Sequence, residues 1–296
     1  MFSRFICILF PALFLNPLSP RAAEDFAIRL SHPEKPGARM ETDTTADTDD
    51  VVTFSVRGRV FRENKNQESW RLRAMETIDA ITDQSEASRK TLKVIEFTQS
   101  SDGVTKPVLK PGAIIKAASD KGEETFTVDG SPAAPQVRKM LERLVSLSED
   151  GRPTDDDLYG TSKRKKIGER WPIDSKAIAR AMKTAKLSVA PDAVTGQATL
   201  KAVREKNGRR FLEIETTVAT RDMEVEFIPT FKVVKAESKT TFSGLFPADD
   251  KGGRIQDAMD TTFVVVGKGR RSPEEPEVTA EARTHVKLSR TIKYLE

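Results

Sequence analysis

Residues 278–294 read VTAEARTHVKLSRTIKY, and this stretch alternates apolar and polar side chains over its length. Val286 and Leu288, for example, share one parity, whereas His285 and Lys287 share the other. Because side chains of a β-strand point alternately to opposite faces, the pattern predicts one strand with an apolar and a polar face. At about 3.3 Å per residue it would reach roughly 55 Å, and a strand of that length must twist or coil.

Other segments carry the same period of two. Val51–Phe61 alternates and predicts a strand in which Gly58 marks a bulge or a close approach of backbones. Asn207-Gly208 separates two further apolar runs, Ala198–Val203 and Phe211–Val218, and predicts a hairpin because both turn residues tolerate positive φ. These segments together predict an antiparallel sheet.

Two stretches are interpreted from their polarity. Ser31–Asp50 has almost no apolar side chains and carries six acids, which predicts a solvated loop. Met223, Val225 and Phe227 alternate with acids and predict a short strand that ends at Pro229.

The centre of the chain changes to a helical period. One amphipathic helix is predicted over Val137–Val145, and a second begins at Asp174 as its N-cap and runs to Ala185. Ile173 before that cap and Ile178 after it form the pair expected of a hydrophobic staple. Ser148–Lys166, between the helices, is charged and predicts a linker. The apolar positions of the two helices are Val137, Met140, Leu141, Leu144, Ile178, Ala181 and Met182.

These elements predict a mainly β (α+β) fold: a long antiparallel curved sheet, or open half-barrel, covered by two short amphipathic helices. Residues 24–296 are expected to form a single β-rich domain. The alternative is two similar halves, residues 24–150 and 160–296, joined by the charged linker.

Residues 1–23 have the features of a secretory signal peptide. Arg4 precedes the apolar run Phe5–Leu15, and small residues follow at Ala22–Ala23. The run is too short for a bilayer span, which needs about 20 residues, so no transmembrane span is expected after cleavage. An uncleaved membrane anchor is the alternative. The lone Cys7 lies in this segment, and a chain without disulfides suits export to a bacterial periplasm or the extracellular space.

Composition excludes several functions. The 49 basic and 45 acidic residues nearly balance, so no nucleic-acid partner is expected. Two His and one Cys exclude a Cys/His zinc site. The acids Asp155–Asp157 fail as an EF-hand, because position twelve is Lys166 where a Glu is required. No nucleophile motif is present, so no catalytic residue, metal or cofactor is expected; a hydrolase using dispersed carboxylates is kept as an alternative.

Two short segments look related to each other. Lys35–Met40 and Lys166–Trp171 both read basic–x–Gly–x–Arg–apolar. The chain thereby resembles a loose group of uncharacterised secreted β-rich bacterial proteins, common in planctomycete-like genomes, with Lys-x-Gly and Ile-Gly-x-x-Trp segments. The resemblance implies a fold and an exported location, and no activity. The order of helices and long strands is also similar to periplasmic lipoprotein carriers of the half-barrel type.

We therefore expect an exported cell-envelope protein that acts as a non-enzymatic binding or structural module. Its partner would be a lipid, an apolar peptide segment or another envelope protein. A periplasmic carrier that holds acyl chains of lipid or lipoprotein in a half-barrel cavity is the first alternative. The candidate ligand-binding residues on the apolar face are Val137, Leu141, Leu144, Trp171, Ile178, Met182, Val286 and Leu288.

Overall fold

The computed structural model describes residues 24–120, 123–184, 187–249, 252–270 and 274–295. The predicted signal peptide, residues 1–23, lies outside these ranges and stays a prediction. Most of the described chain belongs to one 13-stranded antiparallel sheet, accompanied by a two-stranded sheet and three short α-helices. No helix among the described residues has the length and apolar character needed to cross a membrane.

The large sheet is open. In space its strands follow the order β10 (Arg170–Pro172), β11 (Val194–Lys206), β12 (Arg209–Thr220), β13 (Phe231–Pro247), β14 (Gln256–Gly269), β15 (Val278–Leu295), β2 (Arg39–Val56), β3 (Arg59–Ile81), β4 (Ala87–Ser101), β6 (Ile114–Asp120), β7 (Glu123–Val128) and β8 (Ser131–Pro132). β5 (Val104–Leu109) pairs with β4 beside this path, and β1 (Asp25–Ile28) pairs with β9 (Thr161–Lys166) in the small sheet. Since β10 and β8 at the two ends are not paired with each other, the predicted open curved sheet is confirmed.

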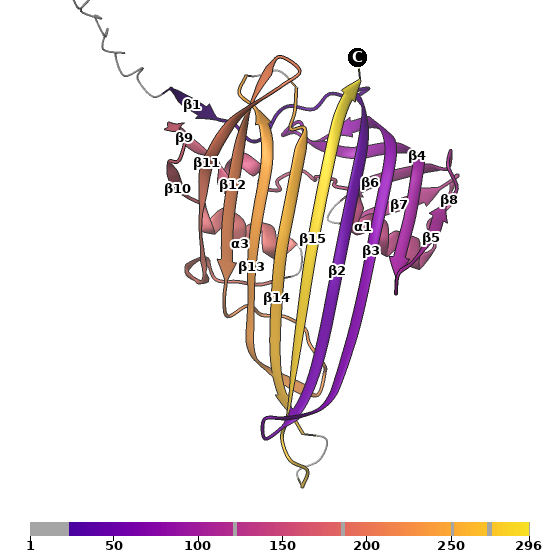
Figure 1. Ribbon diagram of the computed structural model, residues 1–296, viewed down its shortest axis with the longest axis vertical. Coiled ribbons are helices and arrows are strands. Elements are labelled where there is room, and N and C mark those ends of the chain that lie inside the picture. The colour runs from indigo at the N-terminus through magenta and orange to yellow at the C-terminus, as the bar shows by residue number, and fades with distance from the viewer. Residues whose placement is uncertain (1–23, 121–122, 185–186, 250–251, 271–273, 296) are drawn as a thin grey trace, which may run out of the picture.

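β15 joins the two ends of the chain. It pairs with β14 on one side and with β2 on the other, so that Val286 lies opposite Thr48 of β2 and Thr261 of β14. Strands from both sides of the predicted linker thus belong to one sheet. Figure 1 shows that β13, β14, β15, β2 and β3 extend well below the helices.

The interpretation of Ser31–Asp50 as a loop holds for residues 31–38 and is wrong beyond them, because Arg39–Val56 is strand β2. Its threonines alternate with acids, and Thr42, Thr44 and Thr48 are buried together with Met40 and Ala46. Threonine is β-branched and suits a pleated strand, although it counts as polar in composition.

Two further strand predictions are wrong in part. Val51–Phe61 is the end of β2 and the start of β3, because Arg57 and Gly58 form a turn with φ of 50° and 80°. Residues 223–227 do not form a strand of the large sheet; Glu224 makes an isolated bridge with Ser188. Strand β13, which follows them, was not predicted.

Both predicted helices are confirmed as α1 (Pro135–Leu144) and α3 (Ser175–Thr184); Ala185 lies outside the described residues. The side chain of Asp174 accepts the amide N–H of Ala177 at 2.9 Å, as an N-cap should. Ile173 and Ile178 share a buried cluster, in agreement with the predicted staple. The predicted linker contains a third helix, α2 (Asp155–Tyr159), and strand β9.

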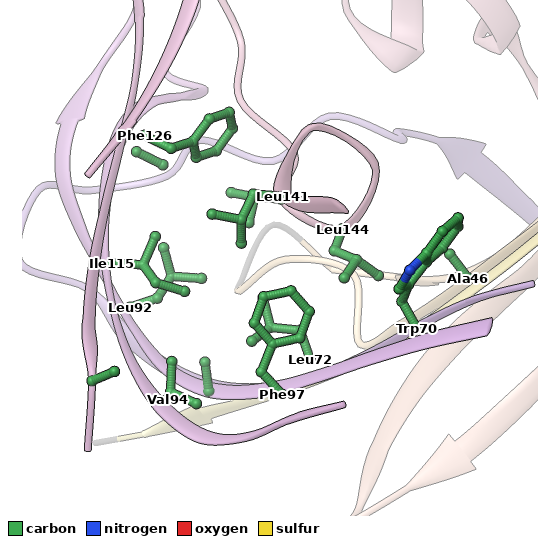
Figure 2. Close-up of a cluster of buried hydrophobic side chains, with 14 of the residues drawn as sticks. Ala46, Trp70, Leu72, Leu92, Val94, Phe97, Ile115, Phe126, Leu141 and Leu144 are labelled. Carbon is green, nitrogen blue, oxygen red and sulfur yellow. The ribbon is translucent and has the colours of Figure 1, made fainter. Parts of the chain in front are cut away.

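α1 and α3 pack on the same face of the large sheet, here called the inner face. α1 contacts β2, β3 and β7, and α3 contacts β11. Figure 2 shows Leu141 and Leu144 of α1 surrounded by side chains of a sheet that curls around the helix, among them Trp70, Leu72 and Phe97.

Candidate binding face

The two faces of the large sheet differ in polarity. Cross-strand ion pairs occupy the opposite, outer face: Arg71 lies 2.7 Å from Asp43, and Arg204 lies 2.6 Å from Glu213. The inner face carries the apolar and threonine side chains, as the parity of β15 predicts. The inner face is therefore the more apolar of the two, and we consider it first as a place for an apolar ligand.

The inner face is filled at both flanks. Around α1, a cluster includes Trp70, Leu72 and Phe97 from the sheet and Leu141 from the helix, all at most 5% exposed. On the other flank, Trp171 packs with β1, β11 and β12 side chains, and its indole N–H donates to the Tyr159 carbonyl at 2.7 Å. These flanks are packed core and leave no space for a ligand.

Between the flanks lies a set of partly exposed side chains that we call the central strip. It crosses three neighbouring strands, because the registers place Leu288 beside Met259, Val286 beside Thr261, and Thr284 beside Phe263. On the other side of β15, Thr284 lies opposite Asp50 of β2. The central strip comprises Met259, Thr261, Phe263, Thr284, Val286, Leu288, Asp50 and Val52, all partly exposed.

Polar atoms of the central strip are satisfied within the protein. The Thr284 hydroxyl donates to the Asp50 carboxylate at 2.6 Å, and the Thr261 hydroxyl lies 3.0 Å from that of Thr240. Apart from the carboxylate of Asp50 at its edge on β2, the strip therefore presents mainly methyl, methylene and aromatic surface.

A chain of ion pairs closes the upper end of the strip. Directly above Leu288 and Met259, Arg290 of β15 lies 2.8 Å from Asp257 of β14, and both side chains are at most 10% exposed. Arg254 bridges this pair to α2, with contacts of 3.2 Å to Asp257 and 2.7 Å to Asp155. An apolar ligand cannot extend past this charged barrier without leaving a buried charge unpaired.

Next to that barrier, β3 and β4 carry a second buried pair. Lys90 lies 3.3 Å from Glu76, whose carboxylate also accepts the Thr42 hydroxyl at 2.6 Å. Burial alone would raise the pKa of Glu76, but Lys90 and Thr42 hold that pKa below its usual range. Glu76 is therefore ionised and compensated.

A small polar cavity of about 190 Å³ lies above these pairs, beneath residues 146–158. Glu86 lines it and accepts the Ser148 hydroxyl at 2.6 Å, while burial raises the pKa of its carboxyl. Lys90, Arg254 and Arg290 also line the cavity and are already paired with carboxylates. The cavity therefore belongs to the structural network that closes the top of the sheet.

The site residues predicted from the sequence lie in different parts of the structure. Val137, Leu141 and Leu144 belong to the cluster around α1. Ile178 and Met182 belong to the cluster beneath α3, and Trp171 lies in a third. The structure thus brings the helix residues into packed cores rather than around one cavity, and only Val286 and Leu288 lie on the central strip.

Sequence reasoning missed the partners of these two residues. Met259, Thr261 and Phe263 were not singled out because β14 contains consecutive apolar residues, which hide its parity. Trp70 was not singled out either. Its indole N–H has no acceptor among the described residues, and Arg143 stacks over its ring at 5.0 Å. Register, which sequence does not reveal, is what brings these side chains together.

The acids examined for calcium have structural partners. Asp157 forms a capping box with Thr154, and Asp156 accepts the amide N–H groups of Leu30 and Ser31. Asp155 pairs with Arg254, as described above. Within the described ranges, no group of three or more His, Cys, Asp or Glu side chains is arranged to hold a metal ion.

No family model matches the chain, and no curated protein matches it. Similar solved structures include lipovitellin, studied for its lipid–protein interactions, at 10% identity and a TM-score of 0.34; the match covers 85% of this chain and 25% of lipovitellin. The outer membrane protein OprG from Pseudomonas aeruginosa matches at 8% identity and a TM-score of 0.18, over 89% of this chain and 99% of OprG. The LolA superfamily protein NE2245 from Nitrosomonas europaea matches at 7% identity and a TM-score of 0.14, over 89% of each chain. This chain therefore spans about a quarter of the length of lipovitellin.

Proposed function

We propose that this protein is an exported, non-enzymatic carrier that holds an acyl chain of a lipid on the central strip. The observation that supports the proposal is the partial exposure of Met259, Val286 and Leu288 on the inner face, between two flanks that are filled. Contiguous exposed apolar surface on a soluble domain commonly marks a binding site.

The dimensions of the strip favour one elongated ligand. From Leu288 of β15 to Val52 of β2, which lies opposite Ala282, it runs for roughly 20 Å at about 3.3 Å per residue. It is three strands wide and ends above at the Arg290–Asp257 pair. A single hydrocarbon chain fits such a shape, and burying its methylene groups against these side chains would contribute about 0.8 kcal/mol each.

A carrier of this kind works in the bacterial envelope, where lipids move between membranes. The predicted signal peptide over Met1–Ala23 supports this location. Mass measurement of the protein purified from its own cells tests it: we expect a chain that begins near Glu24, and a chain retaining residues 1–23 would contradict export with cleavage.

The ligand is tested by native mass spectrometry of the gently purified protein, followed by organic extraction. We expect a reproducible adduct of lipid mass that extracts into organic solvent. A clean mass of the chain alone, together with failure to bind a dansyl-labelled fatty acid, would overturn the proposal. An adduct that is a peptide would keep the strip as a site and overturn its assignment to acyl chains.

Variants of β15 locate the site. Leu288→Asp places a charge between Val286 and the Arg290–Asp257 pair, four residues along β15 from the partner of Asp50, and is expected to abolish binding of the dansyl-labelled fatty acid. Ser289→Asp is the matched control, because Ser289 is the next residue and lies exposed on the outer face. Val286→Phe keeps an apolar side chain but fills the strip, so it should weaken binding without adding charge. Urea unfolding of each variant separates loss of binding from loss of fold, and equal binding by all three would contradict the assignment.

A further inference from the structure

The lower end of the long strands carries an exposed apolar hairpin. Arg57 and Gly58 form the two-residue turn between β2 and β3, and both have positive φ, as tight hairpin turns require. Immediately after the turn, Val60 is 59% exposed and Phe61 is 61% exposed. Figure 1 places this turn at the bottom of the molecule, far from the helices. We call residues 57–62 the tip hairpin.

A bulge directs Phe61 outward. The register places Ser55 opposite Val60 and Phe54 opposite Arg62, so Phe61 has no partner on β2. Its ring lies 6.4 Å from that of Phe54, and Phe54 lies 6.4 Å from Phe231. Phe61 is therefore the exposed member of an aromatic cluster that holds the base of the hairpin in place.

Cations surround the two apolar side chains. Arg57, Arg59 and Arg62 are exposed, and none of them forms an ion pair with a carboxylate of the described residues. Arg270, Glu274 and Glu275, which lie between β14 and β15 in the chain, line a surface pocket together with the hairpin. These two acids offset part of the positive charge. Apolar contact must therefore provide most of any binding free energy, and the arginines must provide any preference for anions.

We propose that the tip hairpin docks on a lipid bilayer, with Val60 and Phe61 among the acyl chains and Arg57, Arg59 and Arg62 at anionic head groups. Apolar side chains flanked by arginine are typical of segments that bind the membrane interface. A protein partner fits less well, because two side chains bury only roughly 300 Å², whereas a stable protein interface buries about 800 Å² per partner.

The test is co-sedimentation of the purified protein with vesicles of phosphatidylcholine alone and of phosphatidylcholine mixed with phosphatidylglycerol. We expect binding to both and tighter binding to the anionic vesicles, with a preference that falls as salt rises. Replacing Val60 and Phe61 by Ser should weaken binding to both at least tenfold. Replacing Arg57, Arg59 and Arg62 by Gln should remove the preference for anionic vesicles and leave binding to phosphatidylcholine unchanged.

Val104→Ser is the matched control. Val104 is 54% exposed and follows another two-residue turn of positive φ, Asp102-Gly103. It should bind as the unsubstituted protein does, and an equal loss in Val104→Ser would overturn the proposal. A Phe61→Trp variant gives a second readout that does not depend on weakening the hairpin: its fluorescence should shift to the blue with vesicles. No shift, or a tip-dependent dimer in sedimentation velocity without vesicle binding, would overturn the assignment to a bilayer.

Discussion

Glu76 and Lys90 form an ion pair that is almost completely removed from water, at 6% and 5% exposure. Breaking such a pair leaves the other charge buried without compensation, which costs about 3–5 kcal/mol. We therefore expect Glu76→Gln to lower the free energy of unfolding by about 3–5 kcal/mol at neutral pH, measured by urea unfolding. Replacing both residues by apolar side chains, as in Glu76→Leu with Lys90→Met, should restore much of that loss.

The same pair predicts a pH dependence. The folded-state pKa of Glu76 is lowered, so its contribution to stability is fully present above the unfolded pKa of about 4.3 and is lost as pH falls through the folded pKa. The difference in stability between the unsubstituted protein and Glu76→Gln should consequently shrink in acid. A difference that stays constant down to the acid transition would contradict an ionised Glu76.

The buried polar residues of the sheet could be predicted only in part from the alternation of polar and apolar residues. The parity of β15 was readable because apolar Val286 and Leu288 contrast with charged Lys287. Arg290 shares the apolar parity, which was the one available signal for its buried pair with Asp257. In β2 the buried positions are mostly threonine, such as Thr44, and threonine suits either face, so polarity alone could not assign them.

The Lys-x-Gly segments are turns with one geometry, and the structure contains a third example at Lys110–Ala113. Gly37, Gly112 and Gly168 have φ of 84°, 87° and 86°. Each glycine N–H donates to a carbonyl of a neighbouring strand, at 2.8, 2.8 and 2.7 Å, and the next residue donates to the lysine carbonyl. A turn with positive φ at its third position favours glycine, and this explains the likeness of the segments without any ligand.

Gly112→Ala tests that explanation. An added Cβ at Gly112 would meet no heavy atom within 4 Å, so the substitution acts on the backbone conformation alone. We expect it to lower the free energy of unfolding by roughly 1–2 kcal/mol, because left-handed φ is unfavourable for alanine. Gly112→Asn should cost less, since asparagine tolerates that region. Equal stability of both variants and the unsubstituted protein in urea would contradict a requirement for positive φ.

Elements were predictable where a local signal marks their ends. α3 has an N-cap, Asp174, and an apolar face, and it was found. α2 has a capping box of Thr154 and Asp157, but five residues are too few to produce a period, and its acids favoured a linker. β13 lacks strict alternation because its register shifts between Val233 and Lys235.

The pairing of β15 with β2 determines how the whole molecule holds together. The two strands come from opposite ends of the chain, and their register runs from Val278 opposite Val56 to Leu295 opposite Arg39. Sequence predicts two apolar-faced strands but not that they are neighbours, since no local pattern encodes a pairing over this separation. Contacts between residues so far apart in the chain cost loop-closure entropy before they contribute to stability. We therefore infer that the sheet folds slowly and as one unit.

Each of the two tryptophans lies in one flank of the sheet. Their fluorescence can therefore show whether the two flanks unfold together. Trp70 lies in the cluster around α1 and Trp171 in the cluster of β1, β11 and β12. In Trp171→Phe, fluorescence reports the first flank, and in Trp70→Phe it reports the second. If β15 and β2 couple the flanks, the urea midpoint by fluorescence should equal the midpoint by circular dichroism in each variant. Ala282→Pro removes a backbone hydrogen bond between β15 and a neighbouring strand. It should lower the urea midpoints of both flanks together. If the fluorescence and circular dichroism midpoints differ, one flank unfolds before the other. That result would indicate two halves that unfold independently and contradict their coupling through β15 and β2.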